Sequence, residues 1–332
     1  MAQLTSYFEN GTYDGGATSK ELGLQGNFDE IWYPVLQTTF EEMNTLEGLY
    51  VKKQISNGTS LKVPVIDEGS VSFTKTGGTI PEEDIQHGSV NILINDALTG
   101  SVSLYDDDKA AINYSFIETK IKNVAKQMAK FHTREIAANL LQAARGVRNS
   151  NDVNVGVVAN ANPAIEIAGW AGLTPAEQGV ALATSLFKAA ETLDLKDVKE
   201  DGRYFICNPS TYYLLFNNLD AINKLYGTSG SYADGKILRI AGIDIIKSNA
   251  YGQNPTDKNG DYFTNVDYGT EGTDLSMGVV TTNEAVAQVE LLSMKVEQFR
   301  KPAQRKTVWY MSKVVGYGIL RNDVAVEIKQ AV

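Results

Sequence analysis

Two short segments of this 332-residue chain carry residue types that suit phosphate or metal binding. Residues 230–237, GSYADGKI, match the first seven positions of a phosphate-binding loop, in which backbone amides cradle phosphate oxygens. The eighth position should be serine or threonine to hold magnesium, but it is Ile237. The following KILRIAGIDIIK is typical of a strand, where such a loop needs a helix. We therefore interpret this segment as a flexible glycine loop before a strand.

The second segment, DKNGDYFTNVD at 257–267, resembles a calcium-binding loop. An EF-hand loop needs its glycine at the sixth position, whereas Gly260 is the fourth residue here, and we expect no helices on either side. This pattern favours a solvated turn over a calcium site.

The remaining candidates for catalysis are few. The chain has two histidines, His87 and His132, and a single cysteine, Cys207. No H-E-x-x-H or G-x-S-x-G pattern accompanies them, so zinc binding and nucleophilic hydrolysis are both disfavoured. Cys207 lies in the apolar run YFIC and is expected to be a small buried side chain. The sequence predicts no catalytic residue, no metal site and no cofactor.

The net charge of −10 is unevenly distributed and disfavours a general nucleic-acid-binding protein. Residues 1–48 contain eight acidic residues and one basic residue, whereas residues 109–150 contain eight basic and two acidic residues. Residues 300–306, RKPAQRK, form a second basic cluster. This cluster is either a solvated connection or a partner for acidic groups of a neighbouring chain. No apolar run approaches the ~18 residues of a membrane span, and the first residues do not resemble a signal peptide.

Residues 49–104 are typical of β structure. LYVKKQIS and TSLKVPVI flank Asn57-Gly58, a strong hairpin signal. A longer ribbon is predicted next, from SVSFTK to SVNILIN. Its tip contains Thr76, Gly77 and Gly78, followed by the acidic run Glu82, Glu83 and Asp84. Because a two-stranded ribbon is marginal on its own in water, we expect it to pack on its own body or on another chain.

Helical signals follow the ribbon. Apolar residues at steps of mostly three or four predict a long helix over 108–146, with Lys120, Lys122, Lys126 and Lys130 on other faces and Arg145-Gly146 as its stop. Further helices are predicted from Pro175 to Leu193 and from Pro209, each with proline in the first turn. RYFICNP predicts a buried strand, and residues 236–248 predict β structure with a turn at Ala241-Gly242. The chain from Gly278 onward predicts more strands. The predicted class is α+β.

In this order, the elements resemble the major capsid proteins of T7-like short-tailed bacteriophages, which have the Hong Kong 97-type fold. The resemblance lies in YVKKQISNGTSLKVPVI (50–66), the helix at 114–144, DGRYFICNPSTYYLLFNNL (201–219) and ILRIAGIDIIKSNAY (237–251). It implies an N-terminal arm, 1–48; an extended β-loop with adjoining strands, 49–104; a peripheral domain, 105–146 and 285–332, with a spine helix at 108–146; and an axial domain, 147–284.

The same resemblance implies the function. It implies assembly in the host cytoplasm into hexamers and pentamers of an icosahedral head, with a scaffolding protein, a portal at one vertex and weakly bound double-stranded DNA inside, and no membrane. The lysine-rich helix then either lines the interior or serves solubility or pairs with the acidic arm. Alternatives are a tail-tube or portal-like protein, and a nucleotide-binding enzyme acting through Lys236. The candidate inter-subunit contacts are Thr76, Gly77, Gly78, Glu82, Glu83, Asp84, Arg300, Lys301, Arg305 and Lys306.

Overall fold

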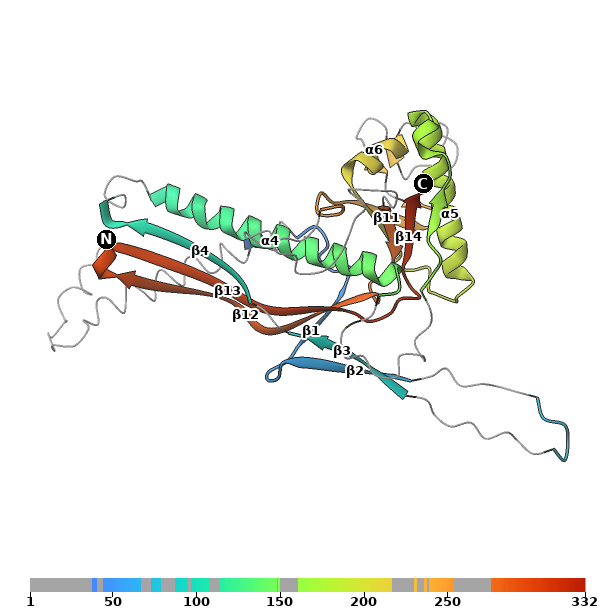
Figure 1. Ribbon diagram of the computed structural model, residues 1–332, viewed down its shortest axis with the longest axis horizontal. Coiled ribbons are helices and arrows are strands. Elements are labelled where there is room, and N and C mark those ends of the chain that lie inside the picture. The colour runs from blue at the N-terminus through green and yellow to red at the C-terminus, as the bar shows by residue number, and fades with distance from the viewer. Residues whose placement is uncertain are drawn as a thin grey trace, which may run out of the picture. The chain divides into compact units, whose positions relative to one another are not determined.

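The computed structural model of the protein (Figure 1) describes residues 38–40, 44–66, 73–78, 87–94, 97–107, 114–147, 149, 161–216, 230–231, 236–237, 239–253 and 276–331. These residues form two compact units. Unit 1 takes its described residues from 1–44, 97–130 and 292–314, and unit 2 from 45–96, 131–291 and 315–332. Three long elements contribute residues to both units: α4 (Tyr114–Ala144), β12 (Val286–Lys301) and β13 (Lys306–Ile319). The predicted arm, loop, peripheral and axial boundaries divide the chain differently and stay predictions.

Unit 1 is an antiparallel sheet covered by the first part of α4. β4 (Ala97–Tyr105) pairs with β13, and β13 neighbours β12. Strand side chains alternate between the two faces, so Leu104, Trp309 and Met311 all point toward the helix. There they pack with Ile121 and Met128 of α4 in one buried cluster, and Figure 1 shows the helix lying along these strands.

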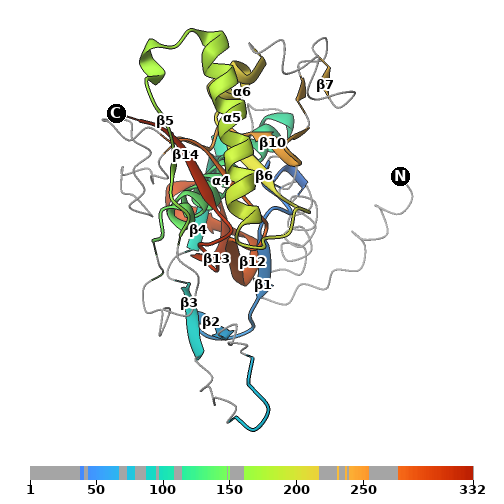
Figure 2. The ribbon, with the colours of Figure 1, turned by 90° about the vertical axis from the view of Figure 1, so that its right-hand side faces the viewer.

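Unit 2 is built on a six-stranded sheet with helices on both faces. The strand order is β5 (Ile165–Ile167), β14 (Val326–Gln330), β11 (Ser276–Thr281), β6 (Tyr204–Cys207), β10 (Ile243–Lys247) and β9 (Arg239–Ile240). Phe205 of β6 packs with Leu186 of α5 (Pro175–Asp194) on one face. Ile206 packs with Leu140 of α4 on the other face. β6 is therefore buried on both sides, which explains the continuous apolar run YFIC. Figure 2 shows α5 in front of β6 and β14.

The long helix ends where its glycine predicts. α4 stops at Ala144, and Gly146 has a φ of 75°. The Gly146 N–H donates to the Ala143 carbonyl at 3.1 Å, and the Val147 N–H donates to the Gln142 carbonyl at 3.0 Å. This pair of bonds caps the last carbonyls, and it needs a left-handed residue that glycine adopts without strain. Residues 108–113, where the helix was predicted to begin, lie outside the described residues.

The two shorter helices begin at the predicted prolines. Thr174 caps α5: its hydroxyl accepts from the Glu177 N–H, and the Glu177 carboxylate accepts from the Thr174 N–H at 2.8 Å. The bonds that the Glu177 carboxylate accepts from the Thr174 N–H and from the Thr174 hydroxyl hold the pKa of this exposed carboxyl below its usual range. α6 (Pro209–Phe216) is capped by Asn208, whose side-chain oxygen accepts from the Thr211 N–H at 2.7 Å. Each cap satisfies a backbone donor that the helix leaves unpaired.

The predicted return strand of the ribbon is confirmed, but its partner is not the predicted SVSFTK, whose described residues 73–75 are not in a strand. The predicted hairpin before the ribbon is also wrong. β2 (Ser60–Ile66) pairs antiparallel with β3 (His87–Leu93) along its whole length. Gly58, with a φ of 110°, lies in a connection between β1 (Val51–Gln54) and β2, but these strands do not pair. Instead β1 runs parallel to Ala287–Glu290 of β12. Asn57-Gly58 correctly indicates a local bend in the chain. The strand that pairs with β1, however, lies more than two hundred residues further along the sequence.

The apparent ligand-binding loops have no supporting context. The GSYADGKI segment contributes β7 (Gly230–Ser231), which pairs antiparallel with β8 (Lys236–Ile237). A strand therefore lies where phosphate binding needs a helix. Ala241 and Gly242 form the predicted turn between β9 and β10, with φ of 52° and 76°. Residues 257–267 lie outside the described residues. Within the described part of the chain, no three His, Cys, Asp or Glu residues are placed to hold a metal ion, and no helix is long and apolar enough to cross a membrane.

Candidate inter-subunit surfaces

The four predicted basic candidates gather at one end of unit 1. β12 ends at Lys301, a short 3-10 helix η5 (Pro302–Gln304) makes the turn, and β13 begins at Lys306. Arg305 closes this turn in the left-handed region, with a φ of 48°. We call the surface formed by Arg300, Lys301, Arg305 and Lys306 the basic turn.

Two of the four cations are already paired within the chain, which the sequence did not reveal. Arg300 donates two hydrogen bonds to Asp106, at 2.9 and 3.3 Å, and Arg305 donates one to Asp107 at 2.8 Å. The Lys306 ammonium lies 5.7 Å from the centre of the Tyr105 ring. Four cations against two carboxylates leave the basic turn with a net charge of about +2. Exposed pairs of this kind contribute only about 0–1 kcal/mol, so a stronger acidic partner can replace them.

The ribbon tip is exposed throughout its described part. Residues 73–78 are all exposed, Gly77 has a φ of 88°, and the Gly78 N–H donates to the Lys75 carbonyl at 2.8 Å. Phe73 is fully exposed, and the sequence analysis did not single it out. A large apolar side chain held wholly in water is typical of a surface that packs on another chain. The acidic candidates Glu82, Glu83 and Asp84 lie outside the described residues.

A third surface lies on the outer face of α5. Val180, Phe187 and Leu195, just after the helix, are 49, 47 and 80 % exposed. They are seven and eight residues apart, so they lie along one side of the helix, opposite the buried Leu182 and Leu186. In the sequence, Val180 and Phe187 are two of the apolar residues of the helix predicted from Pro175 to Leu193. The spacing of apolar residues did not separate these exposed side chains from the buried ones, because a helix with apolar residues on two opposite faces shows no single apolar face.

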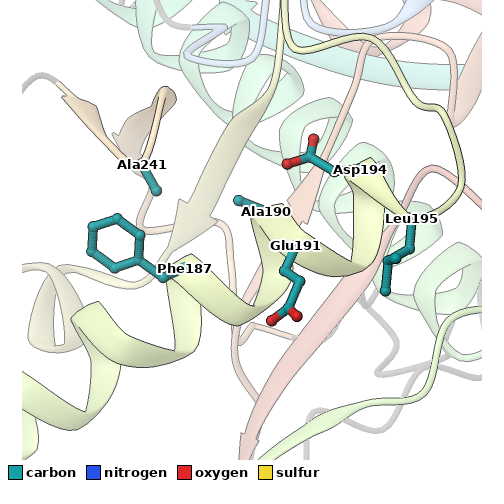
Figure 3. A pocket seen from close by; sticks show the side chains of 6 residues that line it. All are labelled: Phe187, Ala190, Glu191, Asp194, Leu195 and Ala241. Atoms are coloured by element: carbon teal, nitrogen blue, oxygen red, sulfur yellow. The ribbon is translucent and has the colours of Figure 1, made fainter.

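A shallow hollow lies at the C-terminal end of this face. It is lined by Phe187, Ala190, Glu191, Asp194, Leu195 and Ala241. Figure 3 shows Phe187 directed toward the turn that carries Ala241, with Leu195 at the other end. Asp194 is held by an ion pair with the buried Arg203 at 2.7 Å. The hollow therefore combines apolar walls with one acidic residue, Glu191, for which no ion pair occurs among the described residues.

Comparison with known proteins identifies the class. Residues 64–329 match the family model described as "Gp10A-like: Major capsid protein". The capsid structure of the cyanophage P-SCSP1u has 30 % sequence identity and a TM-score of 0.71, and the match covers 86 % of this chain and 88 % of that one. The mature capsid of bacteriophage PhiM1 has a TM-score of 0.70 at 11 % identity, with 86 % of each chain covered. No match was found among curated proteins.

These matches define a capsid protein of the tailed-phage type with the Hong Kong 97-type fold. The chain belongs to the Gp10A-like family of major capsid proteins, and it is a structural component of the virion shell. The predicted α+β class and the predicted family are confirmed. The restriction to T7-like short-tailed phages stays a prediction.

Proposed function

We propose that the chain assembles into hexamers and pentamers of an icosahedral head, without catalytic activity. A scaffolding protein would guide assembly, a portal would occupy one vertex, and double-stranded DNA would be packaged inside. The observation that carries this proposal is the family match across residues 64–329. This range includes β3, α4 and, apart from β1 and the last residue of β14, the strands of the two larger sheets. The lysines of α4 support weak, non-specific contact with DNA because phosphate attracts cations without reading sequence.

Weak contacts are sufficient for such a shell. A contact of millimolar strength corresponds to about −4 kcal/mol. Closing a lattice makes the later contacts effectively intramolecular, so many weak edges give a stable particle and still permit correction during growth.

Electron microscopy of the protein expressed with its scaffold tests the proposal. Closed shells are the expected product, whereas rings or tubes would favour a portal or tail-tube role, and an unassembled chain with turnover would favour an enzyme. Crosslinking of lysines to DNA in filled particles tests the interior contact. Filled particles that yield no lysine adducts would rule that contact out.

The basic turn is proposed to receive the acidic ribbon tip of an adjacent copy. Lys301 is exposed and pairs with no carboxylate among the described residues. The Lys306 ammonium lies over the Tyr105 ring and forms no ion pair with a described carboxylate. Unlike Arg300 and Arg305, these two lysines are not paired with a carboxylate among the described residues, so we propose them as the cations that meet Glu82, Glu83 and Asp84 of another copy. The pairs would bias assembly at low salt and weaken at high salt, because the screening length falls to about 8 Å at 0.15 M.

Charge reversal tests this contact. The change of Lys301→Glu with Lys306→Glu is expected to lower shell yield and to reverse its salt dependence, because salt then screens a repulsion between like charges. Adding Glu82→Lys, Glu83→Lys and Asp84→Lys to the same chain should restore assembly, because the attraction is between copies. Lys199→Glu, at an exposed position of unit 2, is the matched control. Shell yield that follows the parent protein at every salt concentration would eliminate this contact.

The outer face of α5 is proposed to pack on a second copy. Its three apolar side chains keep about half or more of their surface exposed to water. When such side chains become buried in an interface, each contributes about 1–2 kcal/mol to binding. Phe187→Ser with Leu195→Ser is expected to reduce shell yield several-fold while leaving the unfolding temperature of the unassembled protein unchanged. Leu195→Met keeps the apolar surface and serves as the control. A lower unfolding temperature, or unchanged shells, would contradict this assignment.

A further inference from the structure

A connected set of buried polar side chains lies in unit 2 around His132 of α4. His132 is 1 % exposed, and both of its ring nitrogens have hydrogen-bond partners. Nε2 lies 3.0 Å from the Tyr50 hydroxyl, and Nδ1 lies 2.5 Å from the Tyr317 hydroxyl. The Tyr50 hydroxyl also donates to a Glu47 carboxylate oxygen at 3.3 Å, and Glu47 forms an ion pair with Lys52.

These contacts fix the direction of each hydrogen bond. A neutral imidazole donates from one nitrogen and accepts at the other. Because the single proton of Tyr50 points to Glu47, the Tyr50 oxygen accepts from Nε2–H of His132. Nδ1 then accepts from the Tyr317 hydroxyl. The result is a continuous chain of hydrogen bonds from the buried Tyr317 to Glu47, whose side chain is 42 % exposed.

Glu135 lies one helical turn further along α4 and is 2 % exposed. Its Oε1 has no hydrogen-bond partner among the described residues. Burial raises the pKa of Glu135 to about 8, so the carboxyl group retains its proton at neutral pH. Burial, followed by the charges of Glu135, Tyr50 and Glu290, keeps the pKa of Tyr317 well above its ordinary value. A charge on Glu135 would therefore lie close enough to Tyr317 of β13 to raise the pKa of that hydroxyl further.

The same residues support the base of the ribbon. Tyr317 lies between Gly316 and Gly318, and both glycines touch β3. A Cβ atom at Gly316 would lie 2.4 Å from the Leu93 carbonyl oxygen, and one at Gly318 would lie 2.7 Å from Ile92 Cγ1. Tyr50 directly precedes β1, which leads into β2. β3 is therefore linked to Tyr317 through the neighbouring glycines, and β2 is linked to Tyr50 through β1. Tyr317 and Tyr50 are the two residues that hydrogen-bond to His132.

We propose that Glu135 and the hydrogen-bonded residues Glu47, Tyr50, His132 and Tyr317 form a proton-controlled latch that holds the base of the β2–β3 ribbon to α4. With Glu135 protonated, the latch is closed. Loss of that proton places a charge at a buried carboxyl group whose Oε1 has no hydrogen-bond partner among the described residues, close to Tyr317. Opening the latch to water relieves this charge. The ligand that controls the latch is therefore a proton on Glu135, and loss of this proton frees the base of the β2–β3 ribbon.

The sign of the pH dependence follows from the two protonation states. The closed latch holds its proton up to about pH 8, whereas a solvated glutamate releases it near its ordinary value of 4.5. Between these values the closed state binds one more proton than the open state, so opening becomes easier as pH rises. The opening constant is expected to rise by up to about tenfold for each pH unit in this window and to level off above it.

Hydrogen exchange of the unassembled full-length protein tests the latch. Exchange of peptides from β1 and β3 is measured between pH 5 and 9 in the parent protein and in Glu135→Gln, which cannot ionise. The ratio of parent to variant exchange cancels the chemical pH dependence of exchange. This ratio is expected to rise by up to tenfold per pH unit and then level off near pH 8. Glu191→Gln, an exposed helical position, is the control and should follow the parent.

A ratio that does not change with pH would overturn the proposal. If Glu135→Gln does not fold, the parent alone decides the question. Exchange in β3 must then gain on exchange in β6 as pH rises, and a constant difference between the two strands defeats the latch.

The exchange experiment does not depend on the proposed assembly into shells, so the latch and the proposed function can fail separately. Shells that form while exchange is insensitive to Glu135 would refute the latch alone. A latch that titrates in a protein forming no shells with its scaffold would refute the assembly role alone.

Discussion

Replacing Arg145 with methionine is expected to destabilise the protein by about 3 kcal/mol, toward the lower end for breaking a buried ion pair. Arg145 follows the last residue of α4, and Glu327 lies on β14. The guanidinium donates to both carboxylate oxygens, with Nε–Oε2 at 2.9 Å and Nη2–Oε1 at 2.8 Å. The Glu327 side chain is 2 % exposed and that of Arg145 is 24 % exposed.

The size of the effect comes from what the substitution leaves behind. Without Arg145, the Glu327 carboxylate stays buried in the sheet and loses the cation that pairs with it in the described part of the chain. The partial exposure of Arg145 lets some water reach the site, which places the loss near the lower end of the range. Removing both charges is expected to recover most of the stability, because the uncompensated charge is then gone.

The measurement is chemical unfolding of the unassembled protein for Arg145→Met, Glu327→Leu and the double variant. The double variant should be more stable than Arg145→Met. The exposed pair of Arg239 and Asp244 provides the control, and Arg239→Met should leave the unfolding midpoint unchanged. Equal losses in the single and double variants would show that packing, not charge, dominates at Arg145.

Replacing Gly316 with alanine is expected to abolish shell formation while most of the fold survives. The added Cβ would lie 2.4 Å from the Leu93 carbonyl oxygen and 2.9 Å from Ile94 Cγ1. A backbone oxygen cannot turn aside as a side chain does, so β3 must move away from β13. Overpacking of this kind costs about 1–3 kcal/mol. Because β3 is one strand of the ribbon, the ribbon is displaced at its base, where a small shift becomes a large one at the tip.

Electron microscopy of co-expressed protein and thermal unfolding of the unassembled protein check this prediction together. Gly172→Ala is the matched control, because no atom lies within 4 Å of the Cβ it would add and its φ is not in the left-handed region. Normal shells from Gly316→Ala would mean that the ribbon tolerates displacement at its base.

The local signals in the sequence were sufficient for the helices and turns. Pro175 and Pro209 begin α5 and α6, Gly146 ends α4, and Ala241-Gly242 turns between β9 and β10. Each of these features depends on residues within one or two turns of the chain. The family resemblance added the fold class, because the order of elements is itself distinctive.

The partner of each strand and of each charge was less accessible. Asn57-Gly58 marked a bend, but β1 pairs with β12 and not with β2. The basic turn was recognised as a cluster, but its pairing with Asp106 and Asp107 was not. In both cases the partner lies almost two hundred residues away or more, so no local pattern encodes it.

Burial separated residues that the sequence treated alike. His132 lies among lysines in the sequence, yet it is buried between two tyrosines. Tyr50 directly precedes β1, and Tyr317 belongs to β13. Phe187 and Leu186 are adjacent apolar residues of one helix, and only one of them faces the core. The sequence determined the α+β class, the helix ends and the family of shell proteins, because short-range caps, turns and element order carry that information. The tertiary structure decided which side chains meet or remain exposed, because strand pairing and packing join residues that are distant in the chain.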